Sequence, residues 1–273
     1  MKNIALQSGI IYGPVRSRRL GWSLGLNSSP VNYKLCSFNC VYCQYGWTPT
    51  HTMDIGYSSA GVPTPDDFAK ELENTLIKCH EIQIDNITFS GNGEPTLHPE
   101  FEKLVDITKQ LRDRYCPKAN IAVLSNSSTV NNDMVRRALA KLDSRIMKLD
   151  AGTPETFKKI NRPCHNDIDY DAIVNGLKSL KNVSLQTMFV DGAIQNTGNI
   201  EIDEWKDRVG EIQPIKVQIY SLHRPPAASG LLEVPRERLN EIATQTERAT
   251  GVRIEVIVAQ NPYSKRYNQP HRK

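Results

Sequence analysis

Apolar runs rich in strand-forming residues alternate with helical patterns along most of this 273-residue chain. A first strand is expected near 22–35, and the later runs lie at 86–91, 121–126, 145–152, 183–192 and 215–221. Strands that alternate with helices favour parallel pairing, because each helix carries the chain back to the start of the next strand. The runs are mostly apolar rather than alternating, which is typical of strands covered on both faces.

The segments between the runs carry signals for helices. Thr64 and Pro65 stand where an N-cap and a first helical residue are expected, and Thr153 and Pro154 repeat this pattern. The stretch that begins at Phe101 spaces its apolar residues with the period of a helix. About six strand–helix units result, so the sequence predicts an α/β fold, either a doubly wound sheet or an incomplete (β/α)6 barrel of the TIM type.

Polar or glycine residues end each apolar run, and this feature favours the barrel. In β/α barrels the active site is assembled from the carboxyl ends of many strands. The simpler alternative is that these are ordinary turn and cap residues. They are Gly91 to Glu94, Ser125, Asn126, Asp150, Asp191, Gly192, Ser221, His223 and Arg224.

Two parts of unequal size are expected. Residues 1–230 would form the partial barrel, with a cysteine-rich loop at 36–46. Residues 231–273 would form a short C-terminal extension, with a helix at 235–250, a strand at 252–258 and the basic tail "SKRYNQPHRK". A solvated tail is the simplest interpretation of that last segment.

Composition narrows the setting of the protein. The net charge of +4 permits nucleic acid as a partner without indicating it. No apolar run of about 18 residues occurs, so we expect no membrane span. The start lacks the features of a signal peptide, which favours a cytoplasmic location. Thiols stay reduced there, so clustered cysteines indicate metal binding or catalysis rather than disulfides.

Three of the six cysteines lie within eight residues, at Cys36, Cys40 and Cys43. Thiolates select zinc or iron–sulfur clusters. A structural zinc site needs four ligands, and only His51 is near enough in sequence to complete one. A 4Fe–4S cluster held by three cysteines keeps one iron open for another ligand. Iron–sulfur is therefore favoured, with zinc as the alternative.

The segment "CSFNCVYC" (36–43) resembles the signature of the radical S-adenosylmethionine (SAM) superfamily. The segment "SGNGEPTLHPEF" (90–101) is similar to its Gly-Gly-Glu-Pro element, and the resemblance spans about 12–225. Stretches such as "KLDAGTPETFKKINRP" resemble a subgroup of small single-domain members, loosely grouped with wyosine-type tRNA-modifying enzymes. The resemblance implies two cofactors, a 4Fe–4S cluster and SAM.

The resemblance also implies roles for individual residues. Asp150 would bind ribose hydroxyls, or else be an N-cap or a buried structural acid. Asn92 departs from the family, because a glycine usually stands there. The cluster ligands would be Cys36, Cys40 and Cys43. The residues expected to contact SAM are Tyr42 near the adenine, Gly91, Gly93, Glu94 and Pro95 at the methionine, and Ser125 and Asn126 at the ribose or carboxylate.

The implied reaction is reductive cleavage of SAM to a 5′-deoxyadenosyl radical that abstracts hydrogen from a substrate. The electron would come from an external one-electron donor such as flavodoxin or ferredoxin. The alternative is a non-catalytic iron–sulfur or zinc protein that acts in electron transfer or interaction. The "GNGEP" element argues against it, because an electron carrier needs no amino-acid site beside its cluster.

The substrate stays open among a peptide, a small metabolite and an RNA base. Four arginines could hold a phosphate, a carboxylate or an RNA backbone, or else form salt bridges at the barrel rim. They are Arg16, Arg18, Arg19 and Arg224. Trp22 and Trp47 could stack on a base, although core packing is favoured. Cys164, beside His165, is the one remaining cysteine on a predicted loop.

Overall fold

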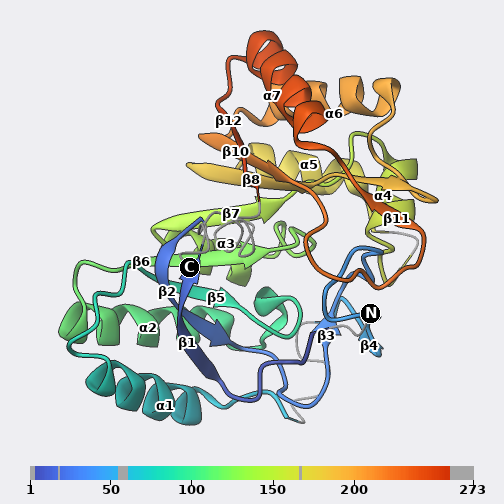
Figure 1. Ribbon diagram of the computed structural model, residues 1–273. Helices are drawn as coiled ribbons and strands as arrows, with labels where there is room; N and C mark the ends of the chain where they lie inside the picture. The colour runs from blue at the N-terminus through green and yellow to red at the C-terminus, as the bar shows by residue number, and fades with distance from the viewer. Residues whose placement is uncertain (1–3, 18, 55–60, 166–167, 259–273) are drawn as a thin grey trace, which may run out of the picture.

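The computed structural model describes residues 4–17, 19–54, 61–165 and 168–258. Within them, the main sheet has the strand order β1-β2-β5-β6-β7-β8-β10-β12 (Figure 1). The strands are β1 (Ile11–Ser17), β2 (Gly21–Asn27), β5 (Asn86–Ser90), β6 (Asn120–Ser125), β7 (Ser144–Lys148), β8 (Val183–Met188), β10 (Lys216–Tyr220) and β12 (Ile254–Val256).

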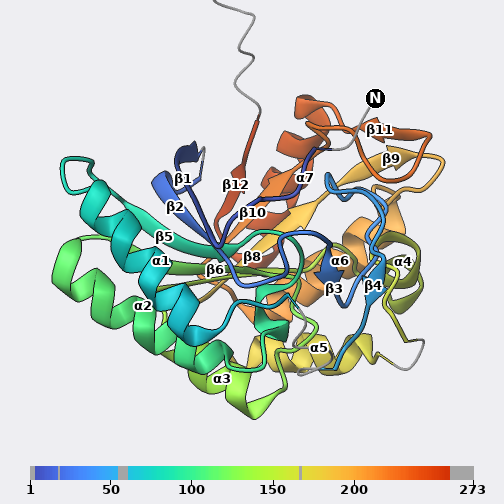
Figure 2. The ribbon, with the colours of Figure 1, turned by 90° about the horizontal axis from the view of Figure 1, so that it is seen from below.

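All neighbouring strands from β2 to β12 pair in parallel, and only β1 pairs antiparallel, with β2. The order ends at β1 on one side and at β12 on the other, so within the described residues the sheet does not close. Figure 2 shows the strands as a curved fan with β1 and β12 at its two edges. The predicted α/β fold with a partial barrel is confirmed.

Helices follow most of the parallel strands and cover the outer side of the sheet (Figure 1). Thr64 and Thr153 cap two of them as predicted, because each hydroxyl accepts a hydrogen bond from a backbone N–H three residues on. The helices are α1 (Pro65–Lys78), α2 (Phe101–Tyr115), α3 (Asp133–Ala140), α4 (Pro154–Ile160), α5 (Tyr170–Lys178), α6 (Asn199–Ile212) and α7 (Arg236–Thr250).

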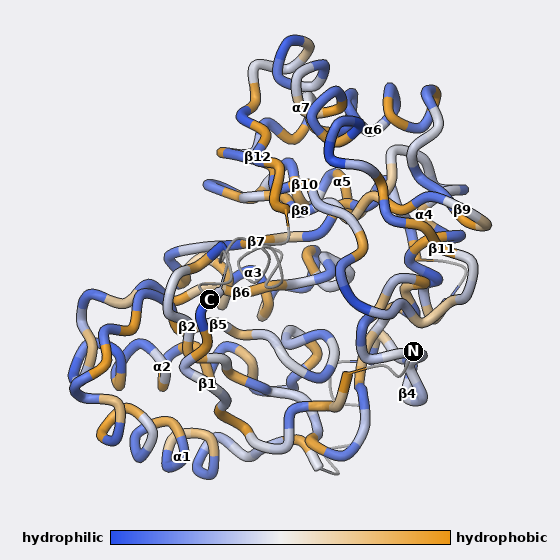
Figure 3. The backbone as a smooth tube through the Cα atoms, viewed as in Figure 1, coloured by the Kyte–Doolittle hydropathy of each residue, from blue (hydrophilic) through white to orange (hydrophobic). Residues whose placement is uncertain are grey.

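The core lies between these helices and the sheet. Apolar residues concentrate along the strands and the inner helix faces, as the orange segments of Figure 3 show. Phe89 of β5 packs edge-on against Phe101 of α2, with ring centroids 5.2 Å apart. On the other half of the sheet, Phe189 meets Trp205 of α6 in the same way at 5.1 Å. This packing fixes the carboxyl ends of the strands, where the candidate site lies.

Several short elements lie outside the main sheet. β3 (Leu35–Cys36) pairs with β4 (Thr50–His51), β9 (Val190–Gly192) pairs with β11 (Leu231–Glu233), and the 3-10 helix η1 spans Pro95–Leu97.

The segment predicted as a C-terminal extension contributes to the main sheet, because β12 pairs in parallel with β10. Arg18 and the basic tail at 264–273 lie outside the described residues. No helix in the described part of the chain is long and apolar enough to cross a membrane.

Candidate active site

The cysteine loop is fixed by backbone hydrogen bonds to the end of α4. The N–H of Val41 donates to the carbonyl of Ile160 at 2.9 Å, and that of Asn39 donates to the carbonyl of Asn161 at 3.0 Å. At the far end of the loop, Gly46 takes a positive φ of 80° and donates to the carbonyl of Cys43 at 3.0 Å. These bonds hold a segment that has little regular structure of its own.

Each of the three loop thiols accepts a hydrogen bond from a buried or half-buried amino or amide group. Asn126 Nδ2 lies 3.5 Å from the Sγ of Cys36, and Asn161 Nδ2 lies 3.4 Å from that of Cys40. Lys34 Nζ donates to the Sγ of Cys43 at 3.1 Å. Donors of this kind stabilise thiolate and tune sulfur-ligated metals. The donor set of three thiols with N–H groups behind them fits a 4Fe–4S cluster.

Two of the three thiols, those of Cys36 and Cys40, are protonated while no metal is bound. Burial raises the pKa of Cys36 to about 12 and that of Cys40 to about 11. Metal binding therefore has to release these protons. Burial alone would lower the pKa of Lys34, but the neighbouring cysteines outweigh it and the pKa is raised. Lys34, which was not predicted from the sequence, thus brings a positive charge to the loop.

His51 was the only candidate for a fourth protein ligand. It lies opposite Cys36 in the β3–β4 pair, and its Nε2 is buried without a hydrogen-bond partner among the described residues. Within the same residues, no three His, Cys, Asp or Glu side chains are gathered as they would be around a single metal ion.

The "GNGEP" element lies against the cysteine loop through its backbone. Gly93 has a φ of 149°, and a Cβ at this position would lie 1.7 Å from the carbonyl oxygen of Leu35. Backbone bonds join the two segments, from Leu35 N to Asn92 O and from Glu94 N to Leu35 O, each at 3.0 Å. Glycine is required here because the chain's own backbone approaches so closely.

Asn92, the departure from the family pattern, has a structural role. Its side chain is fully buried and exchanges hydrogen bonds with the backbone of Gln7, at 2.7 Å and 2.9 Å. Its Nδ2 also donates to the carbonyl of Pro30 at 3.0 Å. A glycine could not make these three contacts, so the asparagine fastens the N-terminal segment to the strand end.

Glu94 is 2% exposed and turns away from the cavity. Its Oε1 accepts from the N–H of Thr96 at 3.1 Å, and its Oε2 accepts from the N–H of Asn126 at 2.6 Å. Burial raises the pKa of this carboxyl group. The side chain therefore positions Asn126, which lines the cavity and donates to Cys36. Pro95 and Ser125 are buried next to it.

Asp150 is also buried, and four donors surround it. Lys148 Nζ lies 2.9 Å and the N–H of Met188 2.8 Å from its Oδ1. The hydroxyl of Tyr42 and the Nδ2 of Asn161 both donate to its Oδ2, the latter at 2.8 Å. This geometry corresponds to the buried structural acid that the sequence left open. Asp150 holds a tyrosine, a lysine and the asparagine that contacts Cys40.

Lys148 is enclosed by two aromatic rings. Its Nζ lies 5.0 Å from the ring centroid of Tyr42 and 5.1 Å from that of Tyr220, whose hydroxyl it contacts at 3.1 Å. Burial by itself would lower the pKa of Lys148, but Asp150 and Tyr220 outweigh it and raise the pKa. The lysine stays charged, and Asp150 balances its charge.

These residues line one cavity of about 380 Å³ at the carboxyl ends of the strands. That volume lies in the range of small-molecule sites, about 300–1,000 Å³. Of the residues predicted from sequence, the cavity is lined by Cys36, Cys40, Cys43, Tyr42, Gly91, Gly93, Asn126, Arg19 and Arg224. Those not predicted include Lys34, Tyr45, Lys148, Met188 and Tyr220.

Several other candidates lie apart from this cavity. Cys79 and Cys116 are the C-cap residues of α1 and α2. The N–H of Cys164 donates to the carbonyl of Ser37 at 3.0 Å, beside the cysteine loop. Trp22 and Trp47 are 45% and 43% exposed, so the preferred interpretation as core residues is wrong.

The family model described as the Radical SAM superfamily matches residues 33–197, which include the cysteine loop and the "GNGEP" element. The chain belongs to this superfamily of enzymes, whose members use a 4Fe–4S cluster and SAM. Within it, the chain belongs to the UPF0026 family. It is 31% identical over 233 residues to a UPF0026 protein of Synechocystis sp., covering 82% of this chain and 79% of the relative.

Two other relatives are longer than the region they share with this chain. A protein of Brachyspira hyodysenteriae called GTPase Obg is 32% identical over 255 residues, which are 92% of this chain and 35% of that protein. A UPF0026 protein of Methanocaldococcus jannaschii is 34% identical over 223 residues, which are 80% of this chain and 65% of the relative. The chain thus spans only part of their length.

Solved structures share the fold at low sequence identity. A radical SAM methyltransferase from Sphaerobacter thermophilus matches with a TM-score of 0.63 at 16% identity, over 87% of this chain and 66% of that one. Streptococcus suis SuiB bound to S-adenosylmethionine matches with a TM-score of 0.59 at 14% identity, over 84% of this chain and 49% of that one.

Proposed function

We propose that this protein cleaves SAM reductively at the cavity above the cysteine loop, with Cys36, Cys40 and Cys43 as the ligands of a 4Fe–4S cluster. The bound cluster supplies the electron that splits SAM into methionine and a 5′-deoxyadenosyl radical, which then takes hydrogen from a substrate. Superfamily membership supports the chemistry, and one observation carries its assignment to this site. The three thiols, Tyr42 and the two glycines of the "GNGEP" element line the same cavity.

The chain's own residues would divide the work of binding. Gly91 and Gly93 leave room beside the loop for the methionine part of SAM, because neither carries a side chain. Tyr42 offers an aromatic face to the adenine, with its hydroxyl fixed by Asp150. Glu94 and Asp150 act through other residues and are positioning residues. Ser125 and Pro95 support the same wall from behind.

Electron supply and shielding complete the proposal. Cys40 and Cys43 are only partly buried, which leaves a face of the loop accessible to an external one-electron donor such as flavodoxin or ferredoxin. The walls formed by Phe38, Met188 and Leu222 would keep water from the radical. The substrate could be a peptide, a small metabolite or an RNA base.

Anoxic reconstitution tests this proposal. The protein is loaded with iron and sulfide, mixed with SAM and dithionite, and analysed for 5′-deoxyadenosine by chromatography. We expect the product from the wild type and from Cys79→Ala, whose cysteine lies at the end of α1. Cys40→Ala should stay folded, lose the visible absorbance of the cluster and give no product.

Two results would count against the proposal. Retained cleavage by Cys40→Ala would contradict the ligand assignment. A wild-type protein with a full cluster and no 5′-deoxyadenosine would favour the alternative of a non-catalytic iron–sulfur protein.

A further inference from the structure

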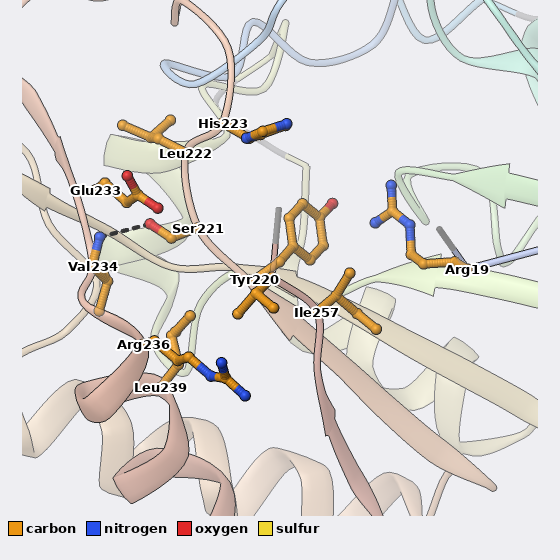
Figure 4. A pocket seen from close by; sticks show the side chains of 11 residues that line it. Arg19, Tyr220, Ser221, Leu222, His223, Glu233, Val234, Arg236, Leu239 and Ile257 are labelled. Carbon is orange, nitrogen blue, oxygen red and sulfur yellow. Dashed lines mark hydrogen bonds between the residues drawn. The ribbon is translucent and has the colours of Figure 1, made fainter. Parts of the chain in front are cut away.

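A second cavity of about 240 Å³ adjoins the first one (Figure 4). The two cavities are adjacent at the end of β10, because five residues line both of them: Arg19, Tyr220, Ser221, Leu222 and His223. The second cavity extends from there to Glu233 and Val234 around β11 and to Arg236 at the start of α7. A ligand could reach from one cavity into the other past Tyr220.

Arg19 extends from the β1–β2 edge of the open barrel to the end of β10. It lies on the turn between β1 and β2, where its N–H donates to the Oγ of Ser17 at 3.3 Å. Its guanidinium lies 4.7 Å from the ring centroid of Tyr220, on the opposite side of the opening. Figure 4 shows the guanidinium facing the tyrosine ring.

The guanidinium of Arg19 is only partly satisfied. Its Nη1 is buried, and in the described parts of the chain no atom accepts a hydrogen bond from it. No described carboxylate forms an ion pair with Arg19 either. A buried donor without a partner is costly, and such groups are rare in native proteins. The unpaired atom therefore indicates a ligand.

Two further arginines at the cavity rim also have no carboxylate partner within the described residues. Arg224, which lines the first cavity, donates to the side-chain carbonyl of Gln44 at 3.1 Å, and Arg236, which lines the second, is exposed at the start of α7. Glu233 is the one acid among the described lining residues of the second cavity. By contrast, Arg112 on the far side of the barrel pairs with both Asp113 and Asp143. Two arginines thus line the second cavity together with a single acid.

We propose that the second cavity binds an anionic group of the substrate, a phosphate or a carboxylate, with Arg19 as the main contact and Arg236 as a second one. A guanidinium presents paired N–H groups that match either anion. This inference rests on the proposed function, because it places the reacting part of the same substrate in the first cavity. Lys148 does not contribute, since Asp150 already neutralises it.

Binding of simple anions to the reconstituted protein, with no SAM present, tests the inference. The probes are inorganic phosphate, acetate and a ten-nucleotide uridine RNA, each titrated by calorimetry. We expect Arg19→Gln to weaken binding of the preferred anion by about tenfold or more, since hydrogen bonds to charged groups are strong. Arg236→Gln should weaken it less. Arg248→Gln is the matched control, because Arg248 is exposed at the other end of α7.

The outcomes separate the sources of the anion. If the RNA binds and depends on Arg19, the group is a backbone phosphate. If phosphate or acetate depends on Arg19 and the RNA does not bind, the substrate is a small anionic molecule. Both results support an anion site.

Unchanged binding of all probes in Arg19→Gln would overturn the inference. Circular dichroism establishes that each variant is folded. Because the titrations contain no SAM, they stand whether or not 5′-deoxyadenosine forms. Failed cleavage would overturn the proposed function, and failed anion binding would overturn this inference alone.

Discussion

The two adjacent cavities differ in how their charges are balanced. In the first, both lysines already have partners: Lys148 pairs with Asp150, and Lys34 donates to the Sγ of Cys43 and the carbonyl of Gly46. In the second, Arg19 has a buried nitrogen without a partner, and Arg236 forms no ion pair within the described residues. The first cavity is thus organised before any ligand binds. The second one contains positive charge without an ion-pair partner, which an anionic ligand would balance. This difference distinguishes a cofactor site from a substrate site.

The largest expected effect comes from removing the carboxylate that balances the charge of Lys148 in the first cavity. Asp150→Asn leaves the buried ammonium of Lys148 without its counter-charge and should lower the free energy of unfolding by about 3–5 kcal/mol. Urea denaturation measures this loss. The double variant Asp150→Leu with Lys148→Met removes both charges and should lose less. An equal loss in the two variants would show that the charges do not depend on each other.

The close backbone contact at Gly93 gives the next effect. Gly93→Ala places a methyl group against the carbonyl of Leu35 and should cost about 2–3 kcal/mol, because the backbone must shift. It should also lower the iron content after reconstitution, since the cysteine loop moves. The same change at Gly210, in the last turn of α6, should stabilise the protein by about 0.5–1 kcal/mol, because the added Cβ would meet only Thr250 at an ordinary 3.5 Å. If Gly210→Ala also destabilises the protein, the loss of stability in Gly93→Ala cannot be assigned to the contact with Leu35.

A smaller effect of opposite sign sharpens the comparison. Arg19→Met keeps an apolar side chain over Tyr220 and removes a charge that has no partner. We expect the free energy of unfolding to rise by up to about 1 kcal/mol, since an unbalanced buried charge opposes folding. Denaturation by urea, without added anions, is the measurement. A loss of stability comparable to that of Asp150→Asn would mean that Arg19 is a structural residue.

The smallest effect concerns the contribution of His98 to the pH dependence of the free energy of unfolding. His98 follows the "GNGEP" element, where its Nε2 lies 2.9 Å from the carbonyl of Pro63 and its Nδ1 accepts from the N–H of Glu100 at 3.0 Å. Burial lowers the pKa of His98 in the folded protein. The unfolded chain therefore takes up the proton first as the pH falls below about 6.5, the ordinary histidine value.

Stability from His98 is thus fully present above that pH and is lost as the pH falls toward the folded-state pKa. Urea midpoints at pH 7.5 and pH 5.5 should differ more in the wild type than in His98→Gln. His80→Gln, in which an exposed histidine is replaced, should keep the wild-type difference. The same difference in all three proteins would assign the pH dependence to other groups.

Features that depend on neighbours in sequence could be predicted. The three loop cysteines lie within eight residues, so their spacing predicted that they lie together, and the structure places them around one cavity. The alternation of strands and helices likewise predicted the parallel sheet, because each unit is local. The antiparallel strand β1 was missed, since its mixed sequence of Pro14, Arg16 and Ser17 has no clear strand pattern.

Features that depend on where a side chain points could not be predicted. Asp150 and Glu94 both end near the cavity, but each turns to donors supplied by distant residues such as Asn161 and Asn126. The role of Asn92 depends on Gln7, 85 positions away in the chain. Arg236 became a candidate only because α7 packs beside β10 and brings its first residue to the same cavity as Arg19.

The most direct test of the central claim is whether the two cavities bind their ligands at the same time. Inorganic phosphate is titrated into the reconstituted protein with and without saturating SAM, and its dissociation constant is compared. We expect both ligands to bind together, with the constant for phosphate changed by less than about twofold, because separate groups bind them. Displacement of phosphate by SAM in proportion to its concentration would show a single shared site and contradict the account.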